Sequence, residues 1–224
     1  MPNANAHSAI SILLVDDHPI VRLGVSQLLD LEPDLRVRWQ AESVDEALAV
    51  CASAEPDMAI IDISLGDESG IELIRKMTRL RPAMQILAMS MHDESLYAER
   101  ALRAGAKGYV MKHSASKTIV AALRRIRAGE IHVSEAMRSR LMSGEMAGEQ
   151  RQTPSGLSLW SNRELEVFRL IGQGLKKSEL AVRLKLSVNT IESHRTRLKK
   201  KLKVSSSAEL ARLAVLHVEG ERGG

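Results

Sequence analysis

Five polar side chains that follow apolar segments are the residues best placed to do chemistry. Asp16 and Asp17 come directly after one apolar run, and Asp62, Ser90 and Lys112 each follow another. Carboxylates gathered in one place repel each other and need a cation, and oxygen ligands at this density suit Mg²⁺. A central carboxylate could attack a phosphoryl group while a lysine and a hydroxyl bind its oxygens. An aspartate after a strand is often only a helix cap, but five such residues together favour a phosphoryl-transfer pocket.

A second group of candidate residues lies in the basic segment 187–203. Its apolar positions recur at helical spacing, with Ile191, Leu198, Leu202 and either His194 or Arg195 on one face. Polar and cationic side chains cover the remaining surface, which would suit the major groove of DNA. The alternative is a solvated basic face that binds nothing. The short helix expected just before this segment favours DNA binding.

Alternating strands and helices must position the first group. Five short runs rich in aliphatic residues predict strands at Ile10–Val15, Leu35–Ala41, Met58–Ile61, Gln85–Met89 and Gly108–Met111. Helical patterns separate and follow them, at about 18–31, 43–53, 69–80, 94–104 and 115–128. This order predicts an α/β fold with a doubly wound parallel sheet. Ligands of such sheets bind beyond the carboxyl ends of the strands, where the five polar residues fall.

Composition sets the broad class of the protein. The 224 residues have room for two domains, and 44% hydrophobic residues can fill a core in each. The one cysteine, Cys51, excludes an intramolecular disulfide and a cysteine-based zinc cluster. No apolar run is long enough to span a membrane, and the N-terminus does not have the pattern of a secretory signal. These features predict a cytoplasmic protein with no membrane partner.

The charge is divided unevenly along the chain. From Trp160 to His217 there are 13 Lys/Arg and 5 Asp/Glu, a net charge of +8, while the remaining residues carry a net charge of −4. A basic C-terminal part suggests a nucleic acid partner for that part alone. With only 2% aromatic residues, stacking on single-stranded nucleic acid is disfavoured.

The N-terminal part carries the motifs of a known family. They are LLVDDHP with the acidic pair, IIDISLGDESG with Asp62, LAMSMHDE with Ser90, and AGAKGYVMK with Tyr109 and Lys112. By these motifs and their relative spacing, residues 9–130 resemble the receiver domain of two-component response regulators. The resemblance implies a flavodoxin-like, five-stranded fold.

The resemblance also implies a role for each pocket residue. Asp62 would be the phosphoacceptor. Asp17 would bind Mg²⁺ directly, Asp16 directly or through water, and the backbone carbonyl of Ser64 would complete the protein ligands. One departure is Gly66, at a position where the family often has proline.

Three further residues of the pocket would respond to the phosphoryl group. By the same resemblance, Lys112 would pair with its oxygens, Ser90 would move toward it, and Tyr109 would follow inward. Ser90 and Tyr109 would thus form the switch.

Residues 131–158 are expected to be a linker with one helix near 133–142, because Ser143–Ser158 is rich in Gly, Ser, Gln and Pro. Beyond it, helices are predicted at Ser161–Ile171, with a capping box formed by Ser161 and Glu164, then at Lys177–Leu184, 188–202 and Ala208–Val218. Two helices joined by a tight turn, the second of them basic, predict a helix-turn-helix.

This C-terminal pattern resembles the LuxR-type, or GerE-type, DNA-binding domain of the NarL/FixJ class of response regulators. The resemblance covers 159–218 through KSELAVRLKLSVNTIESHRTRLKKKLKV and the segments on either side of it. It implies that the helix at 188–202 reads the major groove and that the last helix forms a dimer through Leu210, Leu213 and Ala214. Core packing is the alternative for that apolar stripe.

The expected DNA contacts divide into two kinds. Polar residues at the start of the basic helix would meet base edges, and cations would bind phosphates. Glu192 could accept from a cytosine amine, or pair with Arg195 or Thr196 and read nothing. The predicted contacts are Lys177, Asn189, Thr190, Glu192, Ser193, Arg195, Thr196, Arg197 and Lys200.

Together these features predict a transcription regulator of a two-component system. Phosphorylation of Asp62 by a sensor histidine kinase would promote homodimerisation and binding to double-stranded DNA. One rival is a metal-dependent phosphatase with an aspartyl-phosphate intermediate, which shares the pocket chemistry. That rival expects an acid/base carboxylate two residues after Asp62, where Ser64 stands. Another rival is a regulator that binds RNA or a protein, which the few aromatic residues disfavour.

Overall fold

The computed structural model describes residues 9–66, 68–91, 94–113, 116–143, 160–184 and 186–222. Contacts divide the chain into two compact units, residues 1–149 and 150–224. The part of the predicted linker between 144 and 158 lies outside the described residues. No helix in the described part of the chain is long and apolar enough to cross a membrane.

The N-terminal unit is built on a five-stranded parallel sheet in the order β2-β1-β3-β6-β7. This confirms the predicted doubly wound fold, with β3 and β6 each one residue longer than expected. Four of the strands are largely apolar, as expected where helices cover both faces of a sheet, whereas the edge strand β2 carries Arg36, Arg38 and Gln40. They are β1 Ile10–Val15, β2 Leu35–Ala41, β3 Met58–Asp62, β6 Gln85–Ser90 and β7 Gly108–Met111.

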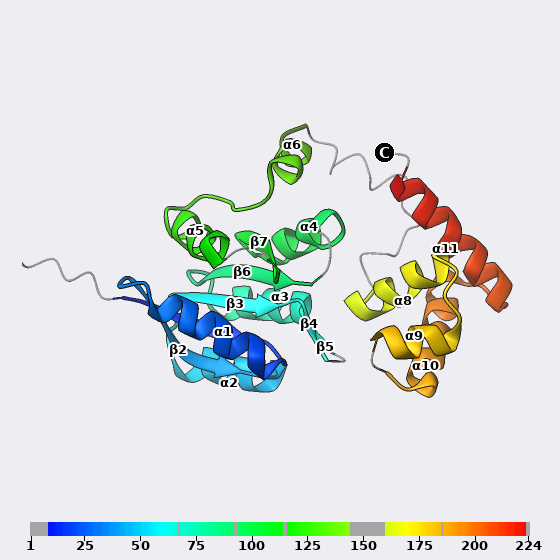
Figure 1. The fold of residues 1–224 in the computed structure, drawn as a ribbon, viewed down its shortest axis with the longest axis horizontal. Helices are drawn as coiled ribbons and strands as arrows, with labels where there is room; N and C mark the ends of the chain where they lie inside the picture. The colour runs from blue at the N-terminus through cyan, green and yellow to red at the C-terminus, as the bar shows by residue number, and fades with distance from the viewer. Residues whose placement is uncertain are drawn as a thin grey trace, which may run out of the picture. The chain divides into compact units, whose positions relative to one another are not determined.

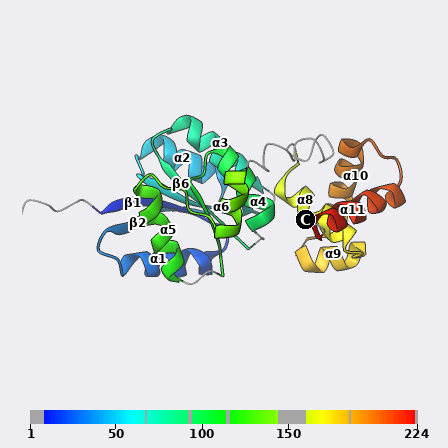
Figure 2. The ribbon, with the colours of Figure 1, turned by 90° about the horizontal axis from the view of Figure 1, so that it is seen from above.

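Helices alternate with these strands, as the sequence pattern predicts. Side chains of α1 and α5 share one hydrophobic core over the sheet, while α2, α3 and α4 pack in succession on the opposite face (Figures 1 and 2). Serine side chains cap α2 and α3 by accepting from the backbone three residues on. The helices are α1 Pro19–Asp30, α2 Val44–Ser53, α3 Gly70–Leu80, α4 Glu94–Ala104 and α5 Ser116–Arg127.

A short hairpin directly after the third sheet strand is not predicted from the sequence. Strands β4 Ser64–Leu65 and β5 Glu68–Ser69 pair antiparallel. Two-residue strands contain too few residues for an alternating pattern to be visible. The first strand of the hairpin begins two residues after Asp62.

The segment after α5 adds to the edge of the sheet. His132 forms an isolated parallel bridge with Gly108 of β7. The Tyr109 N–H donates to the carbonyl of His132 at 2.8 Å, and the His132 N–H donates to the carbonyl of Lys107 at 3.0 Å. Helix α6, Glu135–Ser143, follows and overlaps the predicted helix near 133–142.

The C-terminal unit contains four described helices, α8 Asn162–Gly172, α9 Lys177–Leu184, α10 Val188–Leu202 and α11 Ser207–Arg222. They confirm the predicted helix-turn-helix, with α11 longer than expected. The capping box is present: the Ser161 side chain accepts from the Glu164 N–H, and the Glu164 carboxylate accepts from the Ser161 N–H. Ser187 caps α10 by accepting from the Thr190 N–H at 3.0 Å.

The apolar stripe of α11 belongs to the core of this unit. Leu210 and Ala214 are fully buried, so the prediction that they form a dimer interface is wrong for these two residues. A Cβ on Gly172 would lie 2.3 Å from the Ala214 carbonyl oxygen, so only glycine allows α8 and α11 to approach this closely. The exposed large hydrophobic residues of α11 are Val215 and Leu216.

Candidate functional site

The first candidate site lies at the carboxyl ends of the central strands. Asp16 follows β1, Asp62 and Ser90 end β3 and β6, and Lys112 follows β7. Asp16 and Ser90 are fully buried and Asp62 is 2% exposed. The fold thus gathers the polar residues that the sequence places at strand ends.

Lys112 is the cation at the centre of this pocket. Its Nζ lies 2.7 Å from Asp62 Oδ2 and 2.7 Å from Asp16 Oδ2. Burial alone would lower the pKa of Lys112, but the carboxylates of Asp62 and Asp16 raise it above its usual value. Lys112 therefore stays charged and holds the two carboxylates together.

The Asp62 carboxylate is fixed through both oxygens. Its Oδ1 accepts a hydrogen bond from the Ser64 N–H at 3.1 Å, while Lys112 holds Oδ2. Burial raises the pKa of Asp62 to about 6; Lys112 opposes this shift and Asp16 adds to it. At neutral pH the carboxylate is mostly ionised, buried and restrained, as a nucleophile should be.

The outer side of the pocket is held by His18 and Arg22, which the sequence reasoning did not single out, and by Gly66. His18 Nδ1 lies 2.7 Å from Asp17 Oδ1 and 3.2 Å from Asp16 Oδ1. The Arg22 guanidinium donates to the Asp16 carbonyl. The Gly66 N–H donates to Asp17 Oδ2 at 3.0 Å from a left-handed conformation, φ +55°. A proline at 66 could supply neither the N–H nor that angle, so the departure noted in the sequence gives Asp17 an additional partner.

The acidic side of the pocket has the donor set of a magnesium site. Ligand atoms of Asp16, Asp17, His18 and Asp62 all lie within 4.8 Å of one another. Three carboxylates face the one ammonium group of Lys112, so negative charge remains that a hard divalent cation can balance. The residues present therefore fit Mg²⁺, with carboxylate oxygens as ligands and His18 as their hydrogen-bond partner.

Gly70 allows the start of α3 to pack directly against the backbone of Asp62. A Cβ at this position would lie 1.9 Å from the Asp62 carbonyl oxygen and 2.7 Å from Ile63 Cα. The Gly70 N–H donates to the Ile63 carbonyl at 3.0 Å, which begins α3 directly against the end of β3. The sequence gives no sign of this requirement because the clash arises only when the two segments meet.

The two predicted switch residues are both buried. Tyr109 is 2% exposed, and the Ser90 carbonyl accepts from the Lys112 N–H at 2.6 Å. The Tyr109 side chain is thus already in the inward position that the sequence analysis expects after phosphorylation. The predicted inward movement would have to start from a different conformation, in which Tyr109 is exposed. The hydrogen bond from the Tyr109 N–H to the His132 carbonyl joins β7 to the segment between α5 and α6.

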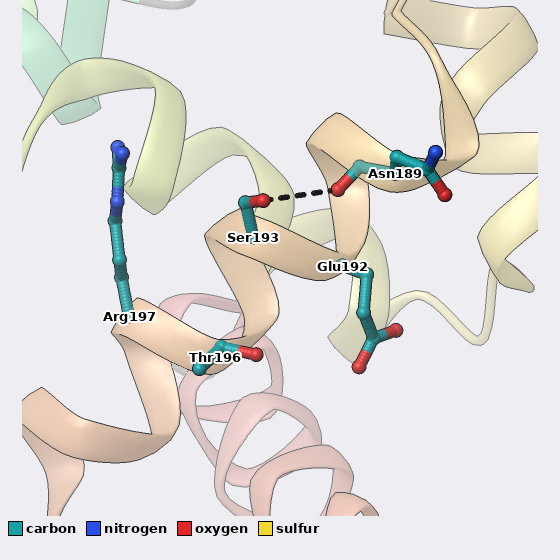
Figure 3. A pocket seen from close by; sticks show the side chains of 5 residues that line it. All are labelled: Asn189, Glu192, Ser193, Thr196 and Arg197. Carbon is teal, nitrogen blue, oxygen red and sulfur yellow. Dashed lines mark hydrogen bonds between the residues drawn. The ribbon is translucent and has the colours of Figure 1, made fainter.

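The second candidate site is the exposed face of α10. Asn189, Glu192, Ser193, Thr196 and Arg197 line one shallow surface hollow (Figure 3). Their side chains come from successive turns of the helix, and the Ser193 hydroxyl donates to the Asn189 carbonyl at 3.1 Å. All five are predicted DNA contacts, and Lys200 is exposed on the same helix.

Arg195 is placed differently from the other predicted contacts. It is 8% exposed and lies in the buried stripe of α10 with Ile191, His194 and Leu198. The sequence offers either His194 or Arg195 for the packing face, and the structure uses both. Phosphate contact by Arg195 therefore does not fit this arrangement, because its side chain packs inside the unit.

Lys177 and Glu192, both predicted DNA contacts, bind each other. Lys177 Nζ lies 2.5 Å from Glu192 Oε2, and Arg195 Nε lies 4.0 Å from the same oxygen. The hydrogen bond from Lys177 lowers the pKa of Glu192, with Arg195 and Lys199 adding to the effect. The glutamate is therefore ionised at neutral pH, and the pair connects the start of α9 to α10.

A further ion pair distinguishes Lys201 of α10 from its neighbour Lys200. Lys201 Nζ lies 2.6 Å from Glu164 Oε2, so Lys201 is used inside the unit. Burial would raise the pKa of Glu164, but Lys201 and the Ser161 N–H lower it overall. The sequence shows a run of lysines without indicating that this one has a buried partner.

Comparison with known families follows the division of the chain. Residues 12–124 match the response regulator receiver domain. Residues 158–214 match the bacterial regulatory proteins of the luxR family.

Whole proteins and solved structures match over nearly the full length. The transcriptional regulatory protein UhpA of Escherichia coli is 37% identical over 203 residues, which is 91% of this chain and 96% of UhpA. RcsB of Salmonella enterica, bound to a promoter with the phosphomimetic BeF3⁻, is similar with a TM-score of 0.56 and 26% identity, covering 91% of this chain and 96% of RcsB. A structure of two RcsB dimers bound to two parallel DNAs has a TM-score of 0.55 and 25% identity, covering 91% and 96%.

Proposed function

We propose a phosphorylation switch at Asp62 for this chain, which belongs to the response regulators that join a receiver domain to a LuxR-type DNA-binding domain. Members of this family regulate transcription by binding DNA and are not enzymes, which sets aside the phosphatase alternative. The observation that carries the proposal is the two buried ion pairs that Lys112 forms with the carboxylates of Asp16 and Asp62.

The chemistry begins with the Asp62 carboxylate. One of its oxygens attacks the phosphorus of a phosphoryl donor, so that an O–P bond forms while the bond to the leaving group breaks and its electron pair departs with that group. The Ser64 N–H and the Lys112 ammonium fix the carboxylate before the attack. Lys112 then pairs with the phosphoryl oxygens, and the Ser90 hydroxyl donates to one of them.

Mg²⁺ would be held by Asp16, Asp17, Asp62 and the backbone carbonyl of Ser64, and it would offset the charge that develops on the phosphoryl oxygens. The chain's own contribution is to orient these ligands. His18 and the Gly66 N–H each bind one oxygen of Asp17, and Arg22 holds the backbone of Asp16.

The output of the switch is homodimerisation and binding to double-stranded DNA. The dimers of RcsB on DNA support this, because that protein shares the fold over most of this chain. Arg195 would support Glu192 from behind rather than touch phosphates. The proposed DNA contacts are Lys177, Asn189, Thr190, Glu192, Ser193, Thr196, Arg197 and Lys200.

The proposed boundaries follow the sequence: a receiver domain at 9–130, a linker at 131–158 and the DNA-binding domain at 159–218. A sensor histidine kinase would supply the phosphoryl group. Because both the DNA and the phosphoryl donor are found there, the protein would act in the cytoplasm.

The test compares wild type with Asp62→Ala, with and without a small phosphoryl donor and Mg²⁺. Sedimentation measures the dimer fraction, titration of duplex DNA measures affinity, and intact mass measures phosphoryl incorporation. We expect the donor to raise all three in wild type and none in Asp62→Ala.

Asp45→Ala provides the matched control, since Asp45 is an exposed aspartate of the same unit on α2. It should behave as wild type in each measurement. Equal DNA binding by wild type and Asp62→Ala, regardless of donor, would show that Asp62 does not gate the function. Competition by duplex against single-stranded nucleic acid tests the choice of DNA.

A further inference from the structure

Glu192 is the one acidic residue of α10, and it lies on the face that would meet DNA. It lines the surface hollow together with Asn189, Ser193, Thr196 and Arg197 (Figure 3). The other lining side chains are neutral or cationic, as expected for a surface that approaches phosphates. A carboxylate among them costs affinity for any DNA that gives it no hydrogen-bond donor.

The ionised carboxylate is held in place from behind. Lys177 and Arg195 both approach its Oε2 atom, at 2.5 and 4.0 Å. The other oxygen, Oε1, is thus the one left for a ligand. Lys177 is the first residue of α9, so the ion pair also fixes Glu192 relative to the supporting helix.

An ionised carboxylate can only accept hydrogen bonds, and this restricts the bases it can meet. In the major groove, guanine and thymine present acceptors, which repel it. Adenine presents a donor next to the N7 acceptor, whereas cytosine presents its N4 amine without a neighbouring acceptor. Cytosine is therefore the base whose edge suits Glu192.

We propose that Glu192 is a specificity-determining residue that selects a base pair presenting the cytosine amine and disfavours the others, with Lys177 as its positioning residue. This inference rests on the proposed binding of duplex DNA by α10. Lys177 also limits the repulsion between the carboxylate and the phosphates, because its ammonium group offsets the charge. Its two remaining N–H donors can still reach a phosphate oxygen.

The experiment uses the full chain, activated with a small phosphoryl donor and Mg²⁺. A random duplex pool is selected with wild type to obtain its preferred site. Affinities of wild type and Glu192→Ala are then measured for that site, for its single-base variants and for a random duplex. At one position in each half-site, we expect a preference for cytosine of about tenfold in wild type and none in Glu192→Ala. Affinity of Glu192→Ala for the random duplex should rise several-fold.

Glu219→Ala is the matched control, because it removes the same charge from an exposed position on α11. It should keep the wild-type preference at every position, which separates base selection from a change in net charge. Glu192→Gln adds a donor to the acceptor and should shift the preferred base at that position from cytosine to adenine.

Lys177→Met tests the positioning role. It should weaken discrimination at the same position in the wild-type background and have no effect on discrimination in a Glu192→Ala background. Unchanged discrimination at that position in the wild-type background, with weaker binding to every duplex, would show that Lys177 only contacts phosphate and would overturn its positioning role. Emission of Trp160, which is buried in this unit, verifies folding of each variant.

The inference would be overturned if Glu192→Ala kept the wild-type base preference at every position and bound random duplex with unchanged affinity. The proposed function would then remain intact. Failure of wild type to bind any duplex after activation would overturn the proposed function, and this inference with it. The two failures are therefore distinguished by the wild-type titration alone.

Discussion

The receiver pocket and the exposed face of α10 are both groups of charged residues, but they are restrained to different degrees. In the pocket, Lys112 holds two carboxylates whose side chains are at most 3% exposed. On the α10 face, Lys177 and Glu192 are about half exposed and pair with each other across two helices. Charges in the pocket are fixed by burial, whereas those on α10 remain in contact with water.

This difference indicates how each region works. A buried carboxylate that must act as a nucleophile needs its geometry fixed before the donor arrives, and loss of one partner leaves the others without compensation. The side chains of a DNA-binding face must instead lose bound water and adjust their conformations to the DNA. They are exposed in the free protein, and exposed charges contribute little to folding stability. Substitutions in the two regions should therefore differ in their effect on stability.

The largest expected effect on stability is that of Lys112→Met. Removing the ammonium leaves the buried carboxylates of Asp16 and Asp62 without their shared counter-charge, which should cost about 3–5 kcal/mol of unfolding free energy. The measurement is urea denaturation without metal, followed by Trp39 emission in a Trp160→Phe background. Trp39 and Trp160 are the two tryptophans of the chain, so this emission reports on the N-terminal unit alone.

Lys107→Met is the control, since Lys107 is an exposed lysine of the same unit. It should change the unfolding free energy by less than about 0.5 kcal/mol. Added Mg²⁺ should recover part of the loss in Lys112→Met because it supplies positive charge to the same carboxylates. Equal effects of the two substitutions would contradict the view that the pocket is fixed by burial.

A pair of glycine substitutions tests packing in the pocket. Gly70→Ala places a Cβ 1.9 Å from the Asp62 carbonyl oxygen, which should cost about 1–3 kcal/mol and slow phosphoryl uptake. Gly24→Ala, on an exposed position of α1 with nothing within 4 Å of the added Cβ, should instead stabilise by about 0.5–1 kcal/mol. The same urea titration measures the unfolding free energy of both variants. Destabilisation by Gly24→Ala would show that helix propensity does not account for the opposite signs expected for the two substitutions.

The sequence predicts most of the fold because its elements are local and strongly patterned. Most strands are short runs rich in aliphatic residues, and Ser161 with Glu164 predicts the start of α8 from four residues. The β4–β5 hairpin is too short to show a period, and the requirement for Gly70 arises only when α3 meets β3. Features that depend on contacts between distant segments are the ones the sequence does not reveal.

The same limit applies to the two candidate sites. The residues of the receiver pocket are predicted because topology places the ends of parallel strands together. On α10, helical spacing predicts which face is exposed, but not that Arg195 is buried with His194 or that Lys177 pairs with Glu192. Long side chains from neighbouring helices decide those contacts, and their partners are far apart in the sequence.

The two units should also respond to pH with opposite signs. The pKa of Asp62 is raised to about 6 in the folded state. Between the ordinary pKa of an aspartate in the unfolded chain and this raised value, the folded state therefore binds more protons than the unfolded state. Its contribution to stability is present at low pH and falls by about 1 kcal/mol between about pH 5 and about pH 7. The pKa of Glu164 is lowered, so its contribution is present above its unfolded pKa and is lost as the solution is acidified.

Single-tryptophan variants separate these responses. Without metal, the difference in Trp39-reported stability between wild type and Asp62→Asn should fall as pH rises from about 5 to 7. The difference in Trp160-reported stability between wild type and Glu164→Gln should stay constant over that range and decrease below about pH 4. A pH-independent difference for Asp62→Asn would mean that Asp62 titrates at its ordinary pKa.

The smallest expected effect on stability is that of Lys200→Ala, and its neighbour provides the sharpest form of the comparison. Lys200 is exposed on α10, whereas Lys201 pairs with the buried Glu164. Lys200→Ala should leave stability within about 0.5 kcal/mol, yet reduce the slope of log affinity against log salt by about 1 through the loss of one phosphate contact. Lys201→Ala should do the reverse, lowering Trp160-reported stability at an unchanged salt slope, because its charge is used inside the unit. If both substitutions changed the salt slope equally, the pairing of Lys201 with Glu164 would not persist on DNA, and an ion pair with a buried carboxylate would not be what separates structural from DNA-binding charges in this helix.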